Sequence, residues 1–278
     1  LAEEFAEDSW RTVSLEKPEK YLTAYHYRNG QDLYLILNED ASHGVSQWVT
    51  LPAGEKGIAA YDAWENKIRQ VKVREAAAGE KDGKIQVYVE LEPLEMLVLL
   101  CGGAGSGDGI PGAVWEAGGA VEAGASEAAT EEIRVLNQFT VSSCESKDYP
   151  DFRDAGKADL ENGMALQHPE FSGIYRYETT VFMDNATENG VKAQLCLTEV
   201  YDSAEVFVNG QSAGIRVARP YRYDITEALK NGENHIAIEV ATTLERKAAA
   251  IGADSGMGAA TPLSPTGLIG DVTLKIQE

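Results

Sequence analysis

Apolar and polar side chains alternate along many short stretches of this chain, which is the pattern of β-strands with one buried face. In one such stretch Ile236, Ile238 and Val240 fall on one side, while His235 and Glu239 fall on the other. A histidine on the polar side of a strand is interpreted as solvated. The stretch therefore predicts a half-buried strand of a sandwich.

An Asn-Gly pair precedes this strand and predicts a β-hairpin. Asn209 and Gly210 separate the apolar run 206–208 from residues 214–217. Asn-Gly readily supplies the two positive φ angles of a type I′ turn. Pro220 has no N–H to give to a ladder, so we expect the chain to turn a corner there.

A helical turn and a long loop are predicted on either side of this strand. Residues 226–230 form the helical turn, with Thr226 as its cap and Gly232 just beyond its end. Residues 242–264 are rich in Gly and Ala and are predicted as a loop.

Strands predicted by the same patterns cover most of the remaining chain. Before residue 102 they are 21–27, 33–39, 47–51, 58–64, 67–73, 84–91 and 94–101, and after residue 132 they are 133–141, 175–182, 191–197, 204–208 and 271–276. The turn between the first two contains Asn29-Gly30. Short strands about every 8 to 12 residues, with turn signals between them, predict β-sandwiches.

The composition changes abruptly at residue 102. Residues 102–132 consist largely of glycine and alanine and contain no Lys or Arg, which is typical of a linker. Trp115 is interpreted as docking on a neighbouring domain, with sugar stacking as the alternative. We therefore expect a β-sandwich at 1–101, a Gly/Ala-rich linker at 102–132 and a second sandwich at 133–278.

An ordered series of motifs in the second sandwich resembles the galactose-binding-type jelly roll of large bacterial glycoside hydrolases, of family 2 and the rhamnosidase-like type. The motifs are HPEFSGIYRYE at 168–178, the Asn-Gly hairpin, PYRYDIT at 220–226, ALKNGENHIAIEV at 228–240 and PTGLIGDV at 265–272. Before the linker, YHYRNG, LILNED, YDAWENKI and LEPLEMLVLLCG resemble the sandwich that follows the catalytic barrel in such enzymes. The resemblance implies an all-β fold and an accessory role beside a catalytic domain, with sugar binding in some members.

Charge and cysteine content exclude several classes of function. The formal net charge is −21 and the pI is about 4.6, so nucleic acid and anionic membranes are not expected as partners. Cys101, Cys144 and Cys196 are widely spaced and form no CxxC, which argues against a disulfide framework and a zinc site. The chain starts without a basic leader, and we interpret it as cut from a longer protein or processed. Localisation is not predicted, although an extracytoplasmic parent enzyme is slightly favoured.

Catalysis is not predicted for this chain. A glycosidase needs two matched carboxyl groups and a scaffold that fixes their separation, and no motif pairs two acids here. The alternating strands and helices of a catalytic barrel are also missing. The four histidines, His26, His43, His168 and His235, are scattered along the sequence.

Sugar binding requires an aromatic platform and polar side chains on loops at one end of a sandwich. Two loops have this chemistry, 147–154 and 219–224. The candidate platforms are Tyr149, Phe152 and Tyr221, and the candidate hydroxyl partners are Asp151, Arg219 and Arg222. The alternative is that Tyr221 or Tyr223 packs into the core.

Asp148, Asp151 and Asp154, with Asp159 nearby, suggest a structural calcium ion, because calcium prefers several oxygen ligands from loops. The spacing differs from an EF-hand, and a solvated acidic loop is the alternative.

The leading hypothesis is a non-catalytic carbohydrate-binding and scaffolding portion of a glycoside hydrolase whose catalytic domain is its partner. The competing hypotheses are purely structural domains that pack on the barrel without binding sugar, and an enzyme in its own right. The glycan, the parent family and the oligomeric state are not predicted.

Overall fold

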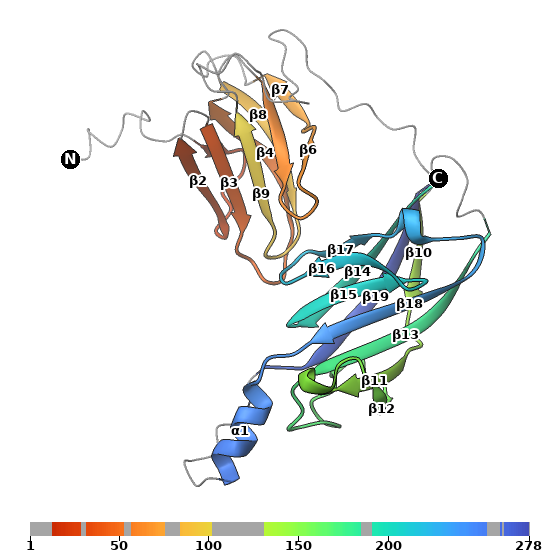
Figure 1. Cartoon of the computed structure of the whole chain (residues 1–278). Helices are drawn as coiled ribbons and strands as arrows, with labels where there is room; N and C mark the ends of the chain where they lie inside the picture. Colours follow the sequence, from red (N-terminus) through yellow and green to blue (C-terminus); the bar gives the residue numbers. More distant parts are fainter. Residues whose placement is uncertain are drawn as a thin grey trace. The chain divides into compact units, whose positions relative to one another are not determined.

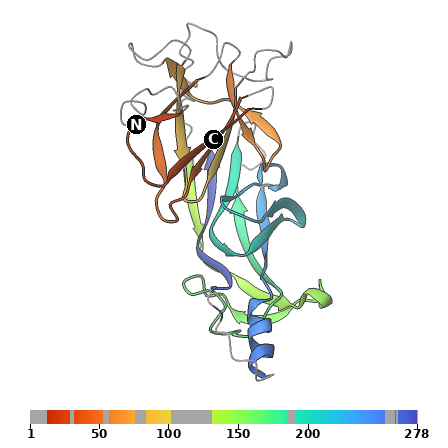
Figure 2. The ribbon, with the colours of Figure 1, turned by 90° about the vertical axis from the view of Figure 1, so that its left-hand side faces the viewer.

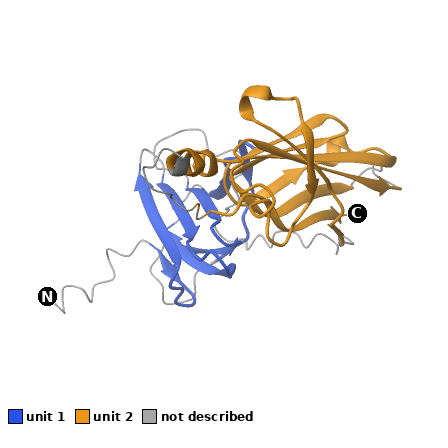
Figure 3. Ribbon diagram, turned by 90° about the horizontal axis from the view of Figure 1, so that it is seen from below, with its two compact units in different colours: residues 1–127 blue, residues 128–278 orange. Residues whose placement is uncertain are grey.

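The computed structural model describes residues 13–28, 32–52, 57–75, 84–101, 131–184, 191–254, 262 and 264–277. The chain divides into two compact units, residues 1–127 and 128–278 (Figure 3). Asn29-Gly30, Trp115 and nearly all of the expected linker lie outside the described residues. None of the helices in the described part is long and apolar enough to cross a membrane.

The first unit is a sandwich of two antiparallel sheets (Figure 1). One sheet has the order β1 (Ser14–Leu15), β4 (Val45–Pro52), β8 (Lys84–Leu91), β7 (Val73–Glu75). The other has the order β2 (Leu22–Arg28), β3 (Asp32–Asn38), β9 (Met96–Cys101), β5 (Ile58–Asp62), β6 (Lys67–Arg69). The side chains that the two sheets direct toward each other form one core. This core contains Ile36 and Leu99 from the second sheet and Val49 and Val87 from the first.

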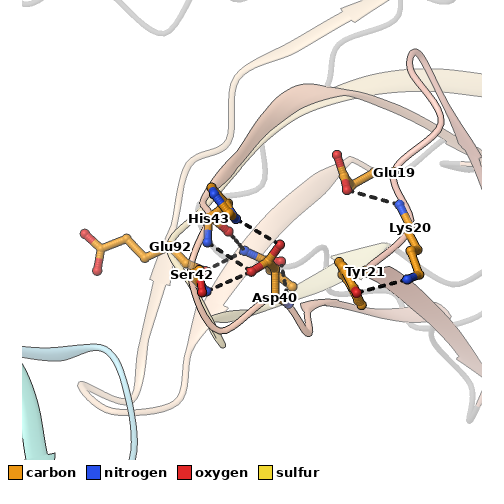
Figure 4. A network of polar contacts seen from close by, with 8 residues as sticks. Glu19, Lys20, Tyr21, Asp40, Ser42, His43 and Glu92 are labelled. Atoms are coloured by element: carbon orange, nitrogen blue, oxygen red, sulfur yellow. Dashed lines mark hydrogen bonds and ion pairs between the residues drawn. The ribbon is translucent and has the colours of Figure 1, made fainter.

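A polar network closes the turn between β3 and β4 (Figure 4). The Asp40 carboxylate accepts the backbone N–H of Ser42 at 2.7 Å and that of His43 at 3.1 Å, and it lies 3.3 Å from the His43 ring nitrogen. These hydrogen bonds hold the pKa of the Asp40 carboxyl below its usual range, and the bond from Ser42 has the largest effect. His43 thus has a structural role in a turn.

The second unit is also a sandwich of two antiparallel sheets. The four-stranded sheet has the order β10 (Glu131–Leu136), β19 (Gly267–Gln277), β14 (Lys192–Tyr201), β17 (Tyr221–Asp224). The six-stranded sheet has the order β12 (Arg153–Lys157), β11 (Thr140–Cys144), β13 (Ile174–Met183), β18 (Gly232–Ala241), β15 (Ser203–Val208), β16 (Gln211–Arg216). One core fills the space between them, with Tyr177 and Ile238 from one sheet and Leu195 and Leu274 from the other.

The expected fold class is confirmed: the described part of the chain is almost entirely antiparallel β-structure in two sandwiches. The Asn-Gly hairpin is also confirmed. Asn209 and Gly210 have φ angles of 53° and 83° between β15 and β16. The Asn209 side chain ties the turn to the segment before β18 by donating to the carbonyl of Ala228 at 2.9 Å.

Two predicted strands and one predicted loop are wrong. The expected strand 67–73 is two strands in different sheets, β6 and β7, and the expected strand 133–141 is β10 and β11, again in different sheets. The loop expected at 242–264 contains helix α1 (Glu245–Asp254), which extends beyond the ends of the strands (Figures 1 and 2). Its ERKAAA segment consists of strong helix formers, and this preference outweighs the Gly/Ala content of the region.

The helical turn η3 (Thr226–Ala228) is a 3-10 turn, and Thr226 does not cap it. The Asp224 carboxylate accepts the Thr226 N–H at 3.1 Å, while the Thr226 hydroxyl accepts the N–H of Ala193 at 3.0 Å. Thr226 therefore links the turn to β14.

Candidate functional site

The outer face of the six-stranded sheet carries a row of charged side chains. Arg176 on β13 lies opposite Glu239 on β18, and Glu239 lies opposite Glu205 on β15. Neighbouring positions Tyr175 and Val240 point into the core, so the alternation of each strand directs the charged row outward.

Arg176 is the centre of this row. Its Nε donates to Glu178 Oε1 at 3.0 Å, and its Nη1 donates to Glu239. Its guanidinium lies 5.6 Å from the ring centre of Phe152 and 5.8 Å from that of Phe207, distances at which aromatic faces attract cations. Burial lowers the pKa of Arg176, but the two carboxylates outweigh burial and raise it.

The loop between β11 and β12 folds onto this row. The Tyr149 hydroxyl donates to Glu239 Oε2 at 3.2 Å. The rings of Tyr149 and Phe152 meet edge to face, with centroids 5.8 Å apart. Tyr149 remains 48% exposed, although its hydroxyl and its ring are each held by one of these contacts. The pKa of Tyr149 is raised by burial and by the nearby Glu239 carboxylate, so this hydroxyl stays protonated and a donor.

The carboxylates of the row differ in exposure. Glu239 is 6% exposed and is compensated by Arg176 and Tyr149. Glu205 is half-buried and accepts the Ser212 hydroxyl at 2.7 Å. His235, expected to be solvated, is half-exposed with Nε2 3.4 Å from Glu178 Oε1. An exposed aromatic ring beside partly exposed carboxylates is an arrangement that can contact a small polar ligand.

The first predicted loop is thus brought to this row. Tyr149 and Phe152 contact it directly, and Asp151 is exposed between them, with its backbone N–H bonded to the Asp148 carbonyl at 2.8 Å. We use the name "Tyr149 surface" for Tyr149, Phe152, Arg176, Glu205 and Glu239.

The second predicted loop, residues 219–224, lies in different surroundings. Tyr221 is 7% exposed and its hydroxyl donates to the Asp202 carbonyl at 3.2 Å. Its ring lies in the core, so it has no free face on which a sugar could stack, and this prediction is corrected. Tyr223 is buried as well; both tyrosines, not one, pack inward because β17 alternates Tyr221 and Tyr223 toward the core.

The four-stranded sheet positions Arg219 and Arg222. Arg219 forms an ion pair with Glu199 Oε1 at 3.1 Å, and the Tyr201 hydroxyl donates to the other oxygen of Glu199 at 2.6 Å. The bond to Glu199, together with burial, raises the pKa of Tyr201 to about 12. Arg222 lies in β17 opposite Cys196. These two arginines are therefore positioned by a different sheet from Tyr149.

The three aspartates of the expected calcium site do not come together. Within the described ranges no group of three or more His, Cys, Asp or Glu side chains is placed to hold a metal ion. Asp154 accepts the N–H of Gly156 at 3.2 Å, and Asp159 accepts that of Asn162 at 2.8 Å. These side chains close turns, and calcium binding stays a prediction from the sequence.

Sequence reasoning missed Arg176, Glu178, Glu205 and Glu239. Each stands at an outward position of an alternating strand, which was the available signal. The signal does not show which strands are neighbours, and only the register of β13, β18 and β15 brings these residues together.

Comparison with known proteins gives the domain type of the second unit. Residues 161–262 match the family model described as glycosyl hydrolase 2 galactose-binding domain-like. Much of the second unit is therefore similar to the galactose-binding-like domain of the glycosyl hydrolase 2 type. The matched residues include β13–β18 and with them Arg176, Glu205 and Glu239, whereas Tyr149 and Phe152 precede the matched residues.

Among solved structures, a rhamnosidase shares the fold of the chain. A rhamnosidase from Novosphingobium sp. PP1Y aligns with 99% of the chain and 26% of its own length, at 21% identity and a TM-score of 0.69. An FMN-binding β-glucuronidase from Facaelibacterium prausnitzii L2-6 aligns with 53% of the chain over 23% of its own length, at 21% identity and a TM-score of 0.39. The chain thus spans about a quarter of the rhamnosidase, and the likeness establishes the fold. No curated protein matches the sequence.

Proposed function

We propose that this chain is a non-catalytic carbohydrate-binding and scaffolding part of a glycoside hydrolase, and that the Tyr149 surface is its sugar site. The proposal is supported by the galactose-binding-like domain in the second unit and by the hydrolase that shares the fold of the chain. The catalytic barrel belongs to another part of the parent protein. In keeping with this, all strand ladders in the described residues are antiparallel, whereas a catalytic barrel needs parallel strands.

The observation that carries the sugar site is the exposed ring of Tyr149 on a fixed polar base. A pyranose presents an apolar C–H face, which packs on an aromatic ring, and hydroxyls, which donate to carboxylates. Tyr149 supplies the ring, and Asp151 and Glu205 supply exposed or half-buried carboxylate oxygens nearby. Because the Tyr149 hydroxyl is bonded to Glu239, the ring is held in place before a ligand arrives, which reduces the entropy lost on binding.

The competing function is purely structural, and one observation favours it. The donors of Arg176 are directed to Glu178 and Glu239, so part of the polar row serves to hold the loop on the sheet. In that case the chain packs on a catalytic domain and binds no sugar.

A glycan array probed with the 278-residue chain, with and without calcium, tests the proposal. Any hit is then titrated by calorimetry with Tyr149→Ala, Arg219→Ala and the control Tyr25→Ala, which removes a tyrosine of similar exposure from the first unit. We expect Tyr149→Ala to lower affinity about tenfold or more, since a lost aromatic contact of about 1.4 kcal/mol corresponds to that factor, while the control is unchanged.

Loss of binding in Arg219→Ala instead would move the site to the second loop. No binding to any glycan would reject the sugar site and leave the structural function. A calcium-dependent hit would support the metal prediction.

A further inference from the structure

The outer face of the five-stranded sheet in the first unit is apolar from one edge to the other. The backbone register places Tyr25, Leu35, Val98, Tyr61 and Ile68 side by side across all five strands. The residues that alternate with them on β3 and β9, such as Ile36 and Leu99, are fully buried in the core. The row therefore points away from the core.

Two flanking rows extend this face. Tyr27, Leu33 and Leu100 lie opposite one another on one side, and Leu37 lies opposite Met96 on the other. Tyr25, Tyr27 and Met96 are 56%, 58% and 51% exposed. No charged side chain occurs at the positions of these three rows in the described strands. Contiguous apolar patches of this kind on a protein surface mark interaction sites.

We propose that this face, the "β2–β6 face", docks against an apolar surface of a further domain of the same polypeptide. The inference rests on the proposed function, which makes the chain an accessory part of a larger enzyme. It assigns the first unit a surface for that attachment, distinct in residues and unit from the Tyr149 surface.

The area of the face favours a tethered domain over a second copy of the chain. With strands about 4.8 Å apart and residues of one face about 6.8 Å apart along each strand, the ten residues of the three rows cover roughly 330 Å². A stable complex of separate proteins buries about 800 Å² on each partner. Two domains of one chain can form an interface with a buried area of only about 600 Å² in total. The polypeptide that connects them keeps their effective concentration high. Docking of the β2–β6 face would bury roughly 330 Å² on each side, or about 650 Å² in total, which reaches the size of an interface between domains but falls short of that between separate proteins.

The chemistry of the face favours protein over sugar. The central row contains aliphatic side chains between its two tyrosines, and the Tyr61 hydroxyl is bonded to Asn66 at 3.0 Å. Sugar hydroxyls need several polar partners, and Leu33, Leu35 and Val98 provide none. An aliphatic and aromatic surface of a protein domain matches this face.

Tyrosine nitration tests the proposal, with Tyr25 and Tyr27 as probes. The 278-residue chain is compared with the longer polypeptide that the proposed function requires, as wild type, as Leu35→Lys and as Ser46→Lys. Leu35 lies at the centre of the face, and Ser46 is an exposed residue on the outer face of the other sheet, so the two variants add the same charge to different faces.

We expect Tyr25 and Tyr27 to react at least fivefold more slowly in the longer polypeptide than in the 278-residue chain. Leu35→Lys should remove this protection, and Ser46→Lys should keep it. Equal reactivity in the two polypeptides would overturn the proposal. So would a dimer of the 278-residue chain in sedimentation that Leu35→Lys dissociates, since the occupant would then be a second copy.

The same variants separate this inference from the proposed sugar site. Leu35→Lys should leave the affinity for any glycan unchanged, because the Tyr149 surface is in the other unit. Protection of the tyrosines without glycan binding would support docking and reject the sugar site. Glycan binding without protection would do the reverse.

Discussion

At the scale of single residues, Arg176 determines whether the Tyr149 surface is stable. Glu239 is 6% exposed, and a carboxylate with so little contact with water depends on its charged partner. Arg176 supplies that charge, while its flat guanidinium also lies against Phe152 from the loop and Phe207 from the sheet. One side chain thus connects the loop, β13, β15 and β18.

We expect Arg176→Met to lower the free energy of unfolding of the second unit by about 2 kcal/mol. Removing one partner of a buried ion pair costs roughly 3–5 kcal/mol, and the value is reduced here because the Arg176 side chain is 26% exposed. Urea denaturation measures it. Arg153→Met, an exposed arginine on the edge strand β12, is the control and should change stability by less than about 0.5 kcal/mol.

The double variant Arg176→Met with Glu239→Met distinguishes an uncompensated charge from lost packing. Replacing both partners of a buried pair by apolar side chains is often neutral, so most of the loss should be recovered. If Arg176→Met alone has the urea midpoint of the wild type, the ion pair does not stabilise this sheet.

At the scale of elements, two glycines with similar backbone angles have different reasons to be glycine. Gly267, at the start of β19, has φ +89°, and a Cβ there would lie 2.4 Å from the Tyr177 hydroxyl oxygen. That oxygen accepts the N–H of Leu268 at 3.1 Å inside the core. Gly210, in the hairpin between β15 and β16, has φ +83° and would meet nothing within 4 Å.

Gly210→Ala should therefore cost about 1 kcal/mol, the penalty of a positive φ for an L-residue. Gly267→Ala should cost at least about 2 kcal/mol, since it adds overpacking and displaces the tyrosine from its hydrogen bond. Urea denaturation of the two variants side by side measures the difference. Equal losses would mean that the core around Tyr177 yields to an added methyl group without strain.

Local patterns predicted most of the strands, but they did not show where the chain passes from one sheet to the other. Alternation fixes which side of a strand is buried, and it correctly described β8, β13 and β18. It cannot show that residues 133–141 leave one sheet after Leu136 and join the other at Thr140, because both halves face the same core. Such a change depends on contacts between residues far apart in sequence.

The candidate site was predictable only in its loop. Tyr149 and Phe152 stand out as aromatic residues in a polar segment, and the structure brings them to the charged row. Tyr221 stands in an equally polar segment, yet it is buried, because the decisive fact is the direction of β17 and not its composition. For the same reason Arg176 and Glu239, 63 positions apart, become neighbours only through the pairing of β13 with β18.

At the scale of the whole molecule, each unit has a core of its own residues. The core of the first unit contains side chains from Tyr34 to Cys101, and that of the second contains side chains from Val141 to Ile276. A sandwich of about 150 residues buries enough apolar surface to fold alone. The second unit should therefore not depend on the first for its stability.

We expect residues 131–278, expressed alone, to fold and to unfold in urea with the midpoint of one of two transitions of the full chain. The other transition should be absent, because its core has been removed. Any glycan bound by the full chain should bind this piece with an affinity within about twofold, since Tyr149, Arg176 and Glu239 all belong to it. Separate units are also what a scaffold needs, because the β2–β6 face can then engage a partner without disturbing the Tyr149 surface. A single cooperative transition in the full chain, lost on truncation, would show instead that the two sandwiches stabilise each other.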